Sequence, residues 1–67
     1  MRNPDRLDEF YKELCKLHKE RFPDWRFGQL CSNFFGWLYS EKGTDMFFPE
    51  EDKMLAYFKE YCGQSNN

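Results

Sequence analysis

The segment 24-DWRFGQLCSNFFGWLYS-40 occupies the middle of this 67-residue chain and dictates its architecture. At the spacing of an α-helix, its large apolar side chains fall on one stripe, which comprises Phe27, Leu30, Cys31, Phe34 and Leu38, flanked by Phe35 and Trp37. Roughly 100–180° round the helix lies a second stripe, in which Gly28, Ser32 and Gly36 recur at every fourth position beside Tyr39. A helix that is apolar or small over most of its circumference is expected to lie between neighbouring elements.

The composition favours an all-α fold. The chain has no Val and no Ile, and Thr44 is its only β-branched residue, whereas strands favour β-branched side chains. We therefore predict one compact three-helix domain over residues 1–67, with a frayed tail at 63–67. The helices are expected near residues 4–22, 24–40 and 49–62, with a short aromatic connector, Met46-Phe47-Phe48, before the last helix.

The expected helix boundaries follow from capping residues. Asn3 and Asp24 can cap the first and the middle helix, and Gly43 can end the middle helix. Pro49 suits the first position of the last helix, and Gly63 is expected to end it.

The aromatic content is the main functional clue. Phe, Trp and Tyr make up 21% of the chain, with 8 Phe, 2 Trp and 4 Tyr. A domain of this size buries only about 60% of the surface of its unfolded chain. Some rings are therefore expected to stay near the exterior or to be covered by a second chain.

Two features leave alternatives open. A glycine inside a helix costs about 0.8–1 kcal/mol relative to alanine, so a close neighbour is expected over Gly28, Ser32 and Gly36. That neighbour is either another helix of the same protomer or a second protein chain. The segment Met46-Phe47-Phe48 is expected to pack over the core as a lid or edge, and the alternative is a protruding hydrophobic patch.

These features define a candidate interaction surface on the middle helix and the connector. It comprises Gly28, Ser32, Phe35, Gly36, Trp37, Tyr39, Met46, Phe47 and Phe48. No catalytic residue is assigned.

The residues that could carry chemistry are expected to be structural. Cys15, Cys31 and Cys62 are too far apart for a C-x-x-C signature and are expected to act as small buried hydrophobes. A zinc site completed by His18 and a disulfide between Cys31 and Cys62 are the disfavoured alternatives. His18 is expected to be half-buried and hydrogen-bonded to the backbone or a Tyr hydroxyl. No glycine-rich phosphate loop is present, so we predict a non-enzymatic protein without metal, cofactor or small-molecule substrate.

Charge and hydropathy limit the partners. Ten Lys and Arg against twelve Asp and Glu give a net charge of −2, whereas phosphate binding requires concentrated positive charge. Nucleic acid is therefore not the expected partner, and a small DNA-binding or transcription-accessory helical domain is the alternative function. No stretch reaches the roughly 20 apolar residues of a membrane helix, and the N-terminus lacks the apolar segment of a signal peptide. The cytoplasm is the expected compartment.

The stretch 23-PDWRFGQL-30, with Asn33 one turn later, resembles a group of short uncharacterised proteins of Gram-positive bacteria and their phages, which carry an R-F-G-Q-L-x-x-N segment. The stretch 47-FFPEE-51 is similar to a second segment of that group, although Pro49 departs from the aliphatic residue expected there. The resemblance implies a phage or mobile-element origin and a protein that binds and inhibits a host protein, including components of antiviral defence. Together with the aromatic surplus, it favours a protein-binding module that forms a homodimer and binds a host protein.

Overall fold

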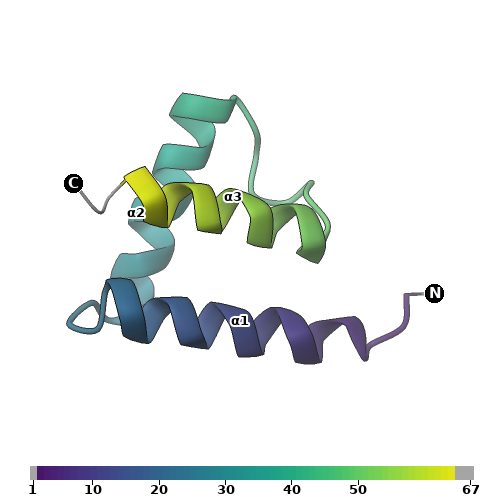
Figure 1. Ribbon diagram of the computed structural model, residues 1–67. Coiled ribbons are helices and arrows are strands. Elements are labelled where there is room, and N and C mark those ends of the chain that lie inside the picture. The colour runs from purple at the N-terminus through teal and green to yellow at the C-terminus, as the bar shows by residue number, and fades with distance from the viewer. Residues whose placement is uncertain (1, 65–67) are drawn as a thin grey trace.

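A computed structural model of the chain describes residues 2–64 and contains three helices: α1 (Arg6–Arg21), α2 (Phe27–Lys42) and α3 (Glu51–Gln64) (Figure 1). No strand occurs within these residues, so the predicted all-α three-helix architecture is confirmed. α1 and α3 lie side by side and run in the same direction, and α2 crosses behind them (Figure 1). α3 packs against both other helices and holds the fold together.

The predicted cap of α1 is wrong, because Asp5 and not Asn3 occupies the N-cap position, without a side-chain cap hydrogen bond. The Asn3 side chain accepts a hydrogen bond from the backbone N–H of Asp5 at 2.9 Å. The next turn is tight, because the Arg6 N–H donates to the Asn3 carbonyl at 3.2 Å. The α-helix therefore begins at Arg6, two positions after the predicted start.

The predicted cap of α2 is wrong. Asp24 lies in the connecting turn, where the Trp25 N–H donates to the Phe22 carbonyl at 3.0 Å. The rings of Phe22 and Trp25 stack with centroids 4.3 Å apart, and Phe22 is buried. This packing commits residues 22–25 to a turn, so α2 begins at Phe27 behind an extended Arg26.

The predicted terminator of α2, Gly43, is confirmed, although the helix runs to Lys42, two residues beyond the predicted end at Ser40. Gly43 adopts φ 63° and donates its N–H to the Tyr39 carbonyl at 3.0 Å. This left-handed conformation carries little penalty for glycine. α2 therefore stops at the glycine that the sequence indicates.

The predicted bounds of α3, residues 49–62, are wrong at both ends. The helix begins at Glu51, so Pro49 lies before it and not at its first position. The helix continues through Gly63 to Gln64, whose side-chain oxygen accepts a hydrogen bond from Trp37 Nε1 at 2.7 Å. This bond ties the last turn of α3 to α2. Residues 65–67 of the expected tail lie outside the described residues.

The core lies between α2 and α3 and includes the residue that follows α1. Its buried members are Phe22, Leu30, Phe34, Leu38, Phe58, Tyr61 and Cys62. Phe34 and Phe58 meet edge to face, with ring centroids 5.0 Å apart. α1 contributes no buried residue, and only partly buried side chains such as Leu14 and Leu17 pack against the core.

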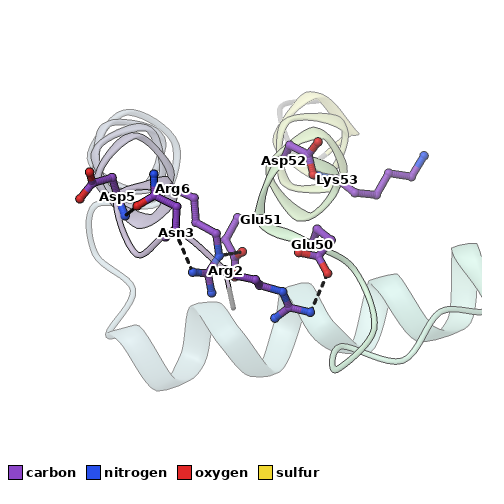
Figure 2. Close-up of polar contacts among 8 residues, drawn as sticks. All are labelled: Arg2, Asn3, Asp5, Arg6, Glu50, Glu51, Asp52 and Lys53. Atoms are coloured by element: carbon purple, nitrogen blue, oxygen red, sulfur yellow. Dashed lines mark hydrogen bonds and ion pairs between the residues drawn. The ribbon is translucent and has the colours of Figure 1, made fainter.

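Two ion pairs join the N-terminal ends of α1 and α3 (Figure 2). Arg6 Nε lies 2.7 Å from Glu51 Oε1, and Arg2 lies 2.7 Å from Glu50 Oε2. The hydrogen bond from Arg6 holds the pKa of the Glu51 carboxyl below its ordinary value. The pairs match the same-direction alignment of the two helices, because they bring both N-terminal ends together.

The aromatic surplus predicted from the sequence is present in the protomer. Phe22, Phe34, Phe58 and Tyr61 are buried, whereas five other rings are exposed: Tyr11, Phe27, Tyr39, Phe47 and Phe48. The three helices therefore leave large apolar side chains in contact with solvent.

Candidate interaction surface

α2 has a core face and an open face. Leu30, Phe34 and Leu38 are buried on the core face. Gly28, Ser32 and Gly36, which we call the small-residue row, are exposed on the open face. A Cβ atom added at Gly28 or Gly36 would meet no atom within 4 Å. Neither α1 nor α3 therefore packs on the small-residue row, and the intramolecular alternative is excluded.

Large apolar side chains border the small-residue row. A ridge along α2 is formed by residues at every fourth position: Phe27, Cys31, Phe35 and Tyr39. Phe27 and Tyr39, at the two ends of this ridge, are 62% and 71% exposed, respectively. A ridge of large side chains thus runs directly beside a row of small ones.

The aromatic connector, Met46-Phe47-Phe48, does not cover the core. Asp45 holds a tight turn, because its Oδ1 accepts from the Phe47 N–H at 3.0 Å and its carbonyl oxygen accepts from the Phe48 N–H at 3.3 Å. The turn leaves Phe47 80% and Phe48 79% exposed. The prediction of a packed lid or edge is wrong, and the alternative of a protruding patch holds.

Part of the connector adjoins the open face of α2. A shallow hollow of about 270 Å³ is lined by Phe35, Gly36, Tyr39, Thr44, Asp45 and Met46. The hollow joins the small-residue row to the start of the connector. Most of the residues predicted for the interaction surface therefore lie on one continuous region.

Trp37 is a member of the predicted surface that lies away from this region. Its ring is half-buried, with its centroid 6.1 Å from that of Phe34 and 5.3 Å from that of Tyr61. Its Nε1 donates to Gln64, and Lys42 Nζ lies 5.8 Å from the ring centroid. Trp37 thus belongs to the packing between α2 and α3, away from the small-residue row.

A second hollow was not predicted from the sequence. It measures about 310 Å³ and is lined by all three helices, through Phe10, Tyr11, Leu14, Phe27, Leu30, Cys31, Phe34, Phe35, Met54 and Phe58. We call it the apolar groove, since none of these side chains is charged. The only sequence signal was the apolar stripe of α2, which equally indicates a core. The groove exists because α1 packs against α3 and not against α2.

The remaining candidate groups are His18 and the three cysteines. His18 is half-buried, and its Nε2 lies 2.8 Å from the Trp25 carbonyl oxygen, as predicted. All three thiols are free, and Cys15 is exposed, contrary to the buried position expected for it. Burial raises the pKa of the Cys31 and Cys62 thiols, which favours the neutral form. Within residues 2–64, no three His, Cys, Asp or Glu side chains are grouped so as to hold a metal ion.

None of the helices in the described part of the chain combines the length and apolar character needed to cross a membrane. No protein family, curated protein or solved structure matches the sequence. The function of this surface is therefore inferred from its own residues.

Proposed function

We propose that this chain is a small, non-enzymatic protein-binding module that self-associates through the open face of α2. The observation that carries the proposal is the small-residue row, over which residues 2–64 place no atom within 4 Å of a Cβ built at Gly28 or Gly36. Glycines within a helix cost about 0.8–1 kcal/mol each relative to alanine. Close packing by a second chain offsets this cost.

The ridge and the row make the open face self-complementary. Rows of side chains four residues apart pack into the matching grooves of another helix, with an axial crossing angle of about −50°. In such a dimer, Phe35 of each copy packs against Gly28, Ser32 and Gly36 of the other. The face from Phe27 to Ser40 carries no charged side chain in a chain that is 33% charged, so two copies meet without repulsion between like charges.

The exposed aromatic area is large enough for such an interface. A fully buried aromatic side chain removes about 150–250 Å² from solvent. Scaled by their exposed fractions, the five exposed rings offer on the order of 500–900 Å². A standard protein interface buries about 800 Å² on each partner, which is within the range that the exposed rings offer together.

Solution mass tests the self-association. We expect the wild-type protein to be a dimer at micromolar concentration by light scattering, and Gly36→Leu to shift it to monomer by filling the row. Ala56→Leu is the matched control, because Ala56 is exposed on α3 and gains the same side chain away from the interface. A wild-type protein that stays monomeric at high micromolar concentration would disprove self-association.

We further propose that the module binds and inhibits a host protein, such as a component of antiviral defence, in the cytoplasm. The resemblance of residues 23–33 to short phage and Gram-positive proteins supports this role, as does the exposed apolar surface. Expression in a Gram-positive host with an active defence system should raise the plating efficiency of a restricted phage. The double substitution Tyr39→Glu/Phe47→Glu should abolish the gain while preserving the fold, because both side chains are exposed. An equal gain from this variant would count against the surface.

A DNA-binding role predicts a different result. Retardation of DNA in a gel that is lost steeply with added salt would favour the alternative of a small DNA-binding domain. We expect no salt-sensitive retardation, because the exposed face of α2 carries no positive charge between Phe27 and Ser40.

A further inference from the structure

The apolar groove can accept aromatic rings. Its ten lining side chains are uncharged and enclose about 310 Å³. An apolar cavity of about 150 Å³ holds one benzene molecule. The groove is therefore large enough for two phenyl rings, and an occupant without charge suits its lining.

The chain itself carries two such rings on an exposed turn. Phe47 and Phe48 are adjacent, and the bonds to Asp45 hold their backbone in a tight turn. Both rings are among the most exposed large apolar side chains of the protomer. A turn held in advance loses less conformational entropy on docking than a free segment.

We propose that Phe47 and Phe48 of one copy insert into the apolar groove of a second copy, so that each protomer of the dimer fills the groove of the other. This inference rests on the proposed self-association and specifies its contacts. Reciprocal insertion closes the assembly at two copies, whereas one-way insertion would build open chains.

The proposed pairing of the α2 helices is compatible with this exchange. α2 has 16 residues and is therefore about 24 Å long. The connector follows its C-terminal end, whereas Phe27 and Cys31 place the groove along its N-terminal half. When two α2 helices pair in antiparallel orientation about the small-residue row, the connector of each copy lies toward the groove of the other.

A disulfide tests which copy receives the turn. Cys31 lines the groove and is free. In a variant with Cys15→Ser, Cys62→Ala and Phe47→Cys, mild oxidation should yield a dimer that links position 47 of one copy to Cys31 of the other. Mass spectrometry of the unreduced peptides identifies the link, and adding Cys31→Ala should abolish it. A link within one chain would show that the connector closes over its own groove and would overturn the proposal.

Complementation tests the exchange without a crosslink. Phe47→Ser/Phe48→Ser removes the rings, and Phe27→Glu places a charge at the edge of the groove. All three side chains are exposed, so both variants should fold, which circular dichroism verifies. Each variant alone should dimerise about 100-fold more weakly than wild type, the loss expected when central aromatic anchors are removed.

An equal mixture of the two variants should recover part of the association. In the mixed dimer, the intact turn of one chain meets the intact groove of the other, whereas neither homodimer has such a pair. If the wild type associates and both variants match it, the inference fails and the proposed self-association stands. If the wild type is monomeric, both fail.

Discussion

The core face and the open face of α2 belong to one helix but meet different neighbours. Leu30, Phe34 and Leu38 are enclosed by the rest of the protomer, whereas Gly28 and Gly36 face open space. The core face stabilises the fold, whereas within residues 2–64 no side chain or backbone atom packs on Gly28 or Gly36 of the open face. The difference separates residues kept for folding from residues available for binding, and substitutions on each face should reveal it.

The largest effect is expected on the core face. Phe34→Ala should cost about 3–5 kcal/mol in free energy of unfolding, because a buried ring leaves a cavity. A domain of this length has a total stability of about 3–10 kcal/mol, so the variant should be largely unfolded by circular dichroism. Phe47→Ala is the control on an exposed ring and should shift the stability of the protomer by less than about 0.5 kcal/mol. Equal losses would erase the distinction between the faces.

A smaller loss is expected at the end of α2. Gly43 adopts φ 63°, a conformation that costs an L-residue with a side chain about 1–2 kcal/mol. Gly43→Ala should lower the stability by that amount in urea unfolding. Gly63→Ala provides the comparison, because Gly63 lies within α3 without a positive φ and with space around it. If both variants lose the same stability, backbone strain at position 43 is not the cause.

On the open face, a substitution should raise the free energy of unfolding and not lower it. Gly36→Ala should stabilise the protomer by about 0.8–1 kcal/mol, because alanine favours the helix and its Cβ would meet no neighbour. Unfolding is followed at concentrations low enough to keep the chain monomeric, so that the interface does not contribute. A destabilised variant would mean that the row packs within the protomer.

The smallest effect concerns the ion pair that joins α1 to α3. The Arg6 guanidinium lowers the pKa of Glu51 in the folded chain. Such a carboxyl stabilises the fold above its unfolded pKa and loses that contribution as the pH falls through its folded pKa. The stability advantage of wild type over Glu51→Gln should therefore be present at neutral pH and vanish in acid, as measured by urea unfolding at both pH values. Glu50→Gln, in a more exposed pair with Arg2, should show a smaller advantage.

The fold was predictable where the signal is local. Three local signals predicted it: the lack of Val and Ile, the apolar stripe of α2, and the terminating glycine at position 43. Each depends only on residue type or on residues close together in the chain. The predicted boundaries failed where distant contacts intervene. The buried ring of Phe22 stacks on Trp25 and draws Asp24 into a turn. Trp37 donates a hydrogen bond to Gln64 in the last turn of α3, which extends past Gly63.

The candidate surface was predictable in composition but not in exposure. Gly28, Ser32 and Gly36 stand out in the sequence, yet their spacing fits a neighbour from either the same chain or another. The exposure of the connector was equally open, because three consecutive apolar residues can either pack over a core or protrude into solvent. In the structure Asp45 holds the connector in a turn, and the rings of Phe47 and Phe48 are exposed.

Residue types and their spacing therefore suffice for the helical class, for a periodic face on α2 and for more aromatic rings than the chain can bury. They do not show which helix meets which, because that depends on contacts between residues far apart in the chain. The packing of α3 against both α1 and α2 leaves the small-residue row uncovered and opens the apolar groove. The apolar groove exists only in the assembled fold, because its lining comes from all three helices. The small-residue row lies on α2 alone, and its exposure depends on which face of α2 the other helices cover.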